Sequence, residues 1–172
     1  MRTKNLVRAA LIAALYVTVS LIWSPFSFGA VQLRISEALT LLPVFCPEAV
    51  VGVTIGCLIS NLLFSTPLDV IVGTTATLLA AFMTRRLRKV RVGKLAIPAA
   101  LPPIVVNAFA IGILLTVQFI APPRAFGAYV WNIVTVGAGQ IGSCLILGVL
   151  LVWAIEKSPP LMRLLGSDSA LS

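Results

Sequence analysis

Histidine is absent from this chain of 172 residues, and charged residues are scarce. Without histidine the chain has no imidazole for a zinc site, for Ser-His or Cys-His catalysis, or for haem ligation. Only 10% of the residues are charged, against roughly 25% in soluble domains, and 59% are hydrophobic. A soluble chain of this size needs more polar surface. The composition therefore predicts an all-α integral membrane protein.

Cysteine is also rare, with three residues at positions far apart in apolar segments. Cys46, Cys57 and Cys144 show no paired spacing, and buried thiols of this kind usually pack as small hydrophobes. The cysteines therefore indicate neither a metal site nor a disulfide framework.

Acidic residues are few as well: 5 against 13 lysines and arginines, for a net charge of +8. The basic residues cluster beside apolar segments, at the start of the chain, at 85–94 and after the last apolar segment. Basic clusters next to transmembrane segments set the orientation of a membrane protein, because the loops that carry them stay on the cytoplasmic side. We therefore expect both termini to be cytoplasmic. Nucleic-acid binding is the weaker interpretation, because no soluble domain is left to carry it.

Prolines and charges divide the apolar sequence into six expected transmembrane helices, which form one membrane domain over 1–172. The expected spans are about 6–24, 33–46, 48–65, 68–84, 95–120 and 129–155, and a basic cytoplasmic connector covers 85–94. Segment 33–46 is short for a crossing, so a re-entrant form stays open. Counting it as a crossing makes the number of spans before the connector even, in agreement with cytoplasmic termini.

Ionisable residues inside apolar segments are costly and usually face a cavity or a partner. Arg34 and Glu37 are three residues apart, so a helix places them on one face. They either neutralise each other at the outer interface or line a solute pocket there, and the neighbouring Gln32 favours the pocket. Asp69 follows Pro67 at an expected helix start, where a helix-dipole role and a binding role are equally open.

Neutral polar and aromatic residues on the expected spans extend this pocket. Asn61, Asn107 and Asn132 either bind helices together, at around 0.6 kcal/mol each, or supply hydrogen bonds to a polar solute. Trp131 belongs either to an aromatic belt at the membrane surface or to the pocket, where it would stack on a flat ring.

Small residues in the first span form two overlapping pairs, Ala9 with Ala13 and Ala10 with Ala14. A strip of this kind lets another helix approach closely. We expect all four alanines to contact a partner.

Three segments resemble the QueT family: Ala9 to Tyr16, Gln32 to Pro43 and Gly56 to Leu62. The resemblance implies a six-helix substrate-binding S component of an energy-coupling factor (ECF) transporter, in the plasma membrane of a prokaryote. Such a subunit captures queuosine or a 7-deazaguanine precursor from outside. It then docks through its alanine strip on an EcfT-like membrane coupling subunit, which works with two cytoplasmic ATPases.

The chain has no G-x-x-x-x-G-K-[ST] phosphate loop, so we expect the partners to use ATP and this chain to be neither an enzyme nor a cofactor carrier. A 7-deazaguanine presents two parallel N–H donors that one carboxylate can accept. Glu37 is the first choice for this carboxylate and Asp69 the second, with Arg34 orienting Glu37. An aminomethyl ammonium would pair with the acid that the ring leaves free.

The ring carbonyl needs a donor, for which the candidates are Gln32, Asn61, Asn107 and Asn132. Two other functions stay open. The chain could be an S component for a vitamin such as riboflavin, thiamine or biotin. It could also be a proton-coupled secondary transporter that uses Glu37 or Asp69 as its relay.

Overall fold

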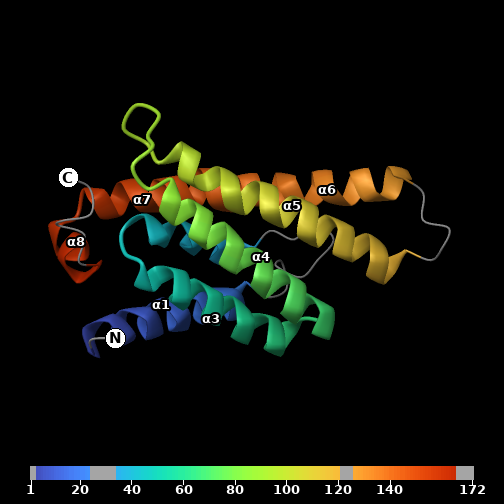
Figure 1. The fold of residues 1–172 in the computed structure, drawn as a ribbon, viewed down its shortest axis with the longest axis horizontal. Helices are drawn as coiled ribbons and strands as arrows, with labels where there is room; N and C mark the ends of the chain where they lie inside the picture. Colours follow the sequence, from blue (N-terminus) through green and yellow to red (C-terminus); the bar gives the residue numbers. More distant parts are fainter. Residues whose placement is uncertain (1–2, 24–33, 121–125, 166–172) are drawn as a thin grey trace.

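The computed structural model describes residues 3–23, 34–120 and 126–165, and its elements there are helices joined by short connectors, one of which, over 87–96, holds an isolated bridge between Val92 and Leu95 (Figure 1). The α-helices are α1 (Thr3–Ile22), α3 (Glu48–Phe64), α4 (Pro67–Arg86), α5 (Ile97–Phe119), α6 (Phe126–Gln140), α7 (Val149–Glu156) and α8 (Pro159–Leu165). A 3-10 helix, η1 (Ile35–Val44), precedes α3, and a π-helix, η2 (Ile141–Gly148), joins α6 to α7. The all-α prediction is confirmed.

Four of the described helical segments are long and apolar enough to cross a membrane: α1, α4, α5 and the continuous stretch Phe126–Glu156. The segment α3 is apolar but shorter, at 17 residues. These are the features of a multi-pass membrane protein. Two features at the basic end differ from the prediction. The helix α4 continues through Arg86, so the basic connector begins later than predicted, and α8 was not predicted.

The segment expected as a span over 33–46 is a 3-10 helix of ten residues, η1. At about 2.0 Å per residue it is roughly 20 Å long, less than the ~30 Å of a bilayer's hydrocarbon core. Residues 36–44 are all buried, and η1 contacts α1, α3, α4, α5, η2 and α7. Non-α backbone is tolerated at membrane depth where protein surrounds it. The sequence therefore predicted a hydrophobic helix here but not its 3-10 form or its full enclosure.

The helices α1 and α3 pack against each other in the same direction. Gly52 lies against Ala9 and Ile12, and Gly56 lies against Ala13 and Tyr16. Because α1 and α3 run the same way, the chain must return along the bundle between them. The described part of that return is η1.

The long helix α5 contains Pro102 and Pro103 in its interior. Proline has no N–H, so the carbonyl four residues before each proline loses its helical partner. For Pro103 that carbonyl belongs to Ala99, and the Thr84 hydroxyl of α4 donates to it at 2.9 Å. Thr84 is fully buried. A side chain of α4 thus replaces the hydrogen bond that the proline removed.

We expect Thr84→Val to destabilise the protein by about 1–3 kcal/mol, the cost of leaving a buried carbonyl unpaired. Thr84→Ser keeps the hydroxyl and is the matched control. Thermal unfolding of the detergent-purified proteins measures both. Equal melting temperatures for Thr84→Val and the native protein would show that the hydrogen bond carries no stability.

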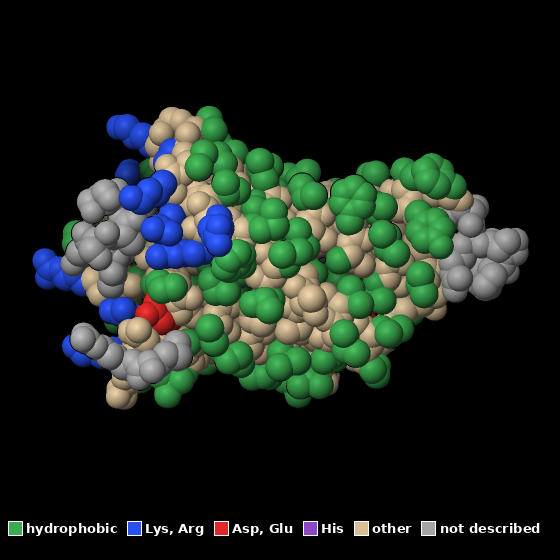
Figure 2. Space-filling model, in the orientation of Figure 1, with side chains coloured by type: hydrophobic (Ala, Val, Ile, Leu, Met, Phe, Trp, Pro, Cys, Tyr) green, Lys and Arg blue, Asp and Glu red, His purple; other side chains and the backbone are tan. Residues whose placement is uncertain are grey.

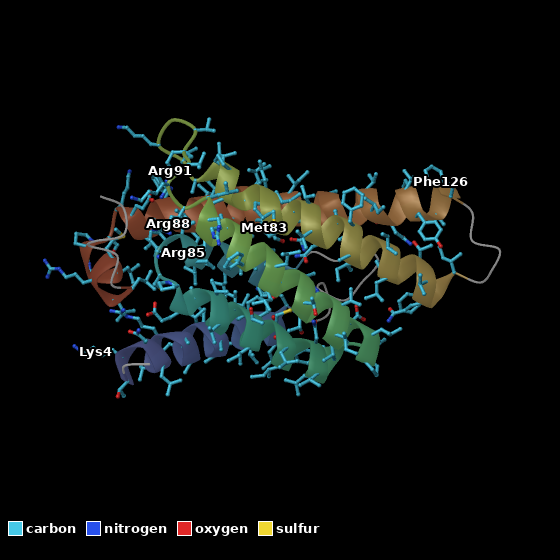
Figure 3. The ribbon with its side chains drawn as sticks, in the orientation of Figure 1. Lys4, Met83, Arg85, Arg88, Arg91 and Phe126 are labelled. Carbon is cyan, nitrogen blue, oxygen red and sulfur yellow. The ribbon has the colours of Figure 1, made fainter. Side chains whose placement is uncertain are left out.

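Basic side chains gather at one end of the bundle, where α1 begins and α4 ends (Figure 2). Figure 3 places Lys4, Arg85, Arg88 and Arg91 at this end, and Phe126 at the other. Arg85 donates to the carbonyl oxygens of Pro43 and Val44, both at 3.0 Å, where η1 ends. These bonds satisfy carbonyls that a helix end leaves open.

The same end joins the beginning of the chain to its last described helix. Arg8 Nε of α1 donates to the Leu164 carbonyl of α8 at 2.8 Å. Arg91 forms an ion pair with Glu156 at 2.8 Å. The first and last described helices therefore lie at one end of the molecule, together with the basic residues.

Candidate functional site

The carboxylate of Glu37 lies fully buried near the middle of the bundle. Its Oε1 accepts a hydrogen bond from the Tyr16 hydroxyl of α1 at 2.8 Å, and its Oε2 accepts one from Asn107 Nδ2 of α5 at 3.3 Å. The backbone carbonyl of Glu37 accepts from Thr40 Oγ1 at 2.6 Å. Three separate elements thus hold one acid inside an apolar bundle, where an ionisable group usually has a functional role.

Arg34 and Asn61 form the next part of this polar interior. The Arg34 guanidinium, 6% exposed, donates from Nη2 to Asn61 Oδ1 at 3.1 Å. Arg34 is one 3-10 turn before Glu37, and side chains three apart eclipse in a 3-10 helix. Arg34 and Glu37 are thus one turn apart, and the guanidinium binds α3 through Asn61.

Asn61 connects this interior to α4. Its Nδ2 lies 3.2 Å from the Asp69 carbonyl and 3.4 Å from Cys57 Sγ. With Arg34 on its Oδ1, this amide already holds three elements together. The Asn61 amide thus fits the helix-binding interpretation, whereas Asn107 contacts the central acid itself.

Two cysteines that looked like isolated hydrophobes belong to the same polar cluster. Thr77 Oγ1 donates to Cys57 Sγ at 3.2 Å. The thiol of Cys144 lies 3.2 Å from Gln140 Oε1 and 3.5 Å from the Glu37 carbonyl. All of these side chains are at most 2% exposed. The prediction that the thiols are buried is confirmed, and no group of three His, Cys, Asp or Glu in the described part of the chain could hold a metal.

Sequence reasoning assigned no binding role to Tyr16 or Thr77, which the structure places in this cluster together with Gln140. Tyr16 carried a usable signal, because a phenol in the middle of an apolar span usually finds a partner when buried. Nothing in the sequence indicated that this partner is Glu37, 21 residues away.

A second polar group lies at the opposite end from the basic residues, where α4 begins and α5 ends. Thr66 and Asp69 form a capping box, which confirms a helix-start role for Asp69. The Thr66 hydroxyl donates to Asp69 Oδ2 at 2.9 Å and accepts from Gln118 Nε2 at 2.6 Å. Asn132 Nδ2 of α6 donates to Thr116 Oγ1 of α5 at 2.9 Å.

One predicted site residue, Trp131, lies outside both groups. Trp131 is 69% exposed on the surface of α6, which fits the aromatic-belt interpretation and leaves it out of the buried cluster. Gln32 falls outside the described residues.

The two alanine pairs of α1 have different surroundings. Ala9 and Ala13 are 4% and 6% exposed, and their carbonyls face Gly52 and Gly56 of α3. Ala10 and Ala14 are exposed and line an apolar groove of about 550 Å³ between α1 and α3. All four alanines line this groove, with Ala9 and Ala13 buried against α3, and their contact with a partner stays a prediction.

The chain is similar to known transporters over most of its length. The QueT transporter family matches residues 6–157. A protein named queuosine precursor transporter QueT, from Lactococcus lactis subsp. cremoris (strain MG1363), is 43% identical over 79 residues, which are 45% of this chain and 47% of that protein. The chain thus matches about half the length of this curated relative. No solved structure gives a significant match.

The predicted resemblance is confirmed by the family match, and so is the expectation of a transport protein instead of an enzyme. Since the match includes all of the buried cluster and extends from α1 into the last long helix, the chain belongs to the QueT transporter family.

Proposed function

We propose that this chain is the membrane-embedded substrate-binding subunit of an ECF-type importer, and that it captures queuosine or a 7-deazaguanine precursor from outside. The observation that carries the proposal is the buried Glu37 carboxylate, held by Tyr16 and Asn107. A transporter relative named for queuosine precursors supports the solute class.

Glu37 suits the amidine-like edge of a 7-deazaguanine. A carboxylate has about four acceptor positions, and the described donors to Glu37 occupy two of them. The remaining lone pairs can accept two parallel N–H groups, as a carboxylate does from a guanidinium. Tyr16 and Asn107 keep the acid oriented before the solute arrives, which lowers the entropy cost of binding.

Arg34 offsets the cost of burying this acid. An unpaired charge at such depth is strongly unfavourable. The guanidinium, one turn away and anchored by Asn61, supplies the opposite charge without covering the acid's remaining acceptor positions. We assign Arg34 and Asn61 to positioning the Glu37 carboxylate. Asn107 and Asn132 stay candidates for donating to the ring carbonyl of the solute. Trp131 is assigned to the membrane surface.

Glu37→Gln is expected to weaken binding of 7-deazaguanines about 10- to 100-fold, because an amide loses a charge-assisted pair worth about 1.5–3 kcal/mol. Isothermal titration of the purified protein measures the affinity. Tyr16→Phe, which removes only the orienting hydroxyl, should cost less. Unchanged affinity in Glu37→Gln would show that the acid does not contact the solute.

The same titration separates the rival functions. A panel with riboflavin, thiamine and biotin identifies an S component for a vitamin if one of these binds more tightly than the deazapurines. Liposomes containing this chain alone test proton-coupled transport. Uptake driven by a pH gradient without ATP would replace the ECF proposal, since an S component relies on its partners for energy.

We propose six crossings with both termini in the cytoplasm. The parallel packing of α1 and α3 requires a return between them, which supports a crossing there, of which η1 is the described part. The basic end then faces the cytoplasm, as the positive-inside rule requires. Lys157 lies 3.8 Å from the ring centre of Trp153, and Arg86 lies 4.8 Å from that of Phe82. Both rings are exposed, which suits the boundary between lipid tails and head groups.

The coupling subunit is proposed to dock in the groove lined by Ala10 and Ala14. Small side chains let a partner helix approach closely in a membrane. The two ATPases of the proposed complex would bind this coupling subunit, and ATP would act only there.

A further inference from the structure

Two buried acceptor atoms at the non-basic end of the bundle have no hydrogen-bond donor. They are Asp69 Oδ1 and Gln118 Oε1. The Asp69 side chain is 7% exposed, and both atoms are inaccessible to solvent. A buried carboxylate oxygen without a donor is expensive, so its presence calls for an explanation.

The two atoms belong to one hydrogen-bonded trio. Thr66 Oγ1 lies 2.9 Å from Asp69 Oδ2 and 2.6 Å from Gln118 Nε2, so a single hydroxyl connects the two side chains. The Thr66 proton goes to Asp69, and the hydroxyl oxygen accepts from Gln118. Within the trio, Asp69 Oδ2 and Gln118 Nε2 therefore have partners. Asp69 Oδ1 and Gln118 Oε1 remain as acceptors without a donor.

The charges of the buried interior favour a positive occupant. Glu48 is buried where α3 begins, directly after the end of η1 that Arg85 of the basic end binds. Apart from it, the buried charged residues in the described part of the chain are Arg34, Glu37 and Asp69. Together they carry one positive and two negative charges. Asn61 connects Asp69 to the central cluster. Its side chain donates to the Asp69 backbone carbonyl and accepts from the Arg34 guanidinium. One additional positive charge would neutralise this interior.

The number of available oxygens favours an ammonium over a metal ion. Hard cations such as Ca²⁺ take six to eight oxygen ligands. The trio offers two acceptors without donors, and no metal-binding group of acids, histidines or thiols occurs in the described ranges. A primary ammonium has three N–H donors, enough for both acceptors and one more contact.

We infer that Asp69 and Gln118 form a subsite for a positively charged group, and that its occupant is a primary ammonium carried by the solute. This inference rests on the proposed function, in which Glu37 takes the ring edge. The subsite then decides which precursor is preferred: a 7-deazaguanine with an aminomethyl substituent over one with an uncharged substituent at the same position.

Titration of the purified protein with two matched solutes tests this. One is 7-aminomethyl-7-deazaguanine, and the other carries an uncharged nitrile in place of the aminomethyl group. We expect the native protein to bind the amine at least tenfold more tightly. Asp69→Asn, which keeps an oxygen for the capping box, should remove that preference and change the affinity for the nitrile less than threefold. Gln118→Met should reduce the preference partly.

The outcomes separate this inference from the proposed function. If the deazaguanines bind but Asp69→Asn weakens both equally or neither, the subsite is wrong and the function stands. If neither solute binds the native protein, the proposed function fails and the subsite fails with it. A thermal shift of the solute-free protein in NaCl against N-methylglucamine chloride tests an inorganic occupant. A Na⁺-specific stabilisation that Asp69→Asn removes would overturn the ammonium assignment.

Discussion

Ala14→Trp is expected to lower solute uptake by the assembled transporter about tenfold or more, while solute affinity of the isolated chain stays within twofold. Ala14 is exposed and lines the apolar groove between α1 and α3. An indole there fills space that a partner helix needs, and overpacking a close helix contact costs about 1–3 kcal/mol. The buried polar cluster lies on the other side of α1, where Tyr16 bonds Glu37, so binding should persist.

Uptake of labelled solute by cells expressing the full complex measures the first quantity, and titration of the purified chain measures the second. Val105→Trp is the matched control, because Val105 is 50% exposed on α5, away from the groove. Normal uptake in Ala14→Trp would show that the coupling subunit docks elsewhere. Equal losses for Ala14→Trp and Val105→Trp would attribute the effect to a bulky ring on any lipid-facing surface.

Gly56→Leu is expected to destabilise the protein by about 3 kcal/mol or more and to weaken solute binding with it. A Cβ on Gly56 would lie 2.6 Å from Tyr16 Cβ and 2.9 Å from its Cγ. The α1 backbone fixes Cβ, and burial of the ring together with the hydrogen bond from its hydroxyl to Glu37 holds Cγ. Overpacking of this kind costs about 1–3 kcal/mol. Moving α1 outward also pulls the Tyr16 hydroxyl from Glu37 Oε1, now 2.8 Å away.

Thermal unfolding and solute titration of Gly56→Ala and Gly56→Leu give the graded effect. Gly137→Ala is the control, because its new Cβ would meet only Ala108 Cβ, at an ordinary 3.5 Å. A helix prefers alanine to glycine by about 1 kcal/mol, so this control should be neutral or slightly stabilising. If Gly56→Ala melts like Gly137→Ala, α1 and α3 do not need their close approach.

The comparison of Ala9 with Ala10 shows where sequence reasoning stops. Both pairs, Ala9 with Ala13 and Ala10 with Ala14, have the same spacing, and small residues at that spacing favour helix contact in either case. Only the position of α3 decides that Ala9 and Ala13 are buried against it while Ala10 and Ala14 stay exposed in the same groove. A pattern on one helix cannot specify which neighbour it meets.

Glu37 and Asp69 show, for the site, the same difference between what the sequence indicates and what the fold decides. Their rarity within apolar segments marked both as functional candidates, since a charge at membrane depth needs a reason. Glu37 takes its partners from distant segments, since Tyr16 and Asn107 are 21 and 70 residues away. Asp69 bonds the nearby Thr66, which in turn accepts from Gln118, 52 residues from Thr66. Contacts at such separation depend on how all the helices pack, which composition and spacing do not encode locally.

By itself the sequence determined that this is a helical protein of the membrane and a QueT transporter, and it marked Glu37 and Asp69 as candidate site residues. Apolar content, charge asymmetry and short motifs are properties of neighbouring residues, so they can be recognised without a fold. The tertiary structure decided that η1 is a buried 3-10 helix, that Arg34 binds Asn61, and that Asp69 keeps one carboxylate oxygen without a donor. Each of these depends on which side chains from distant segments share the same space.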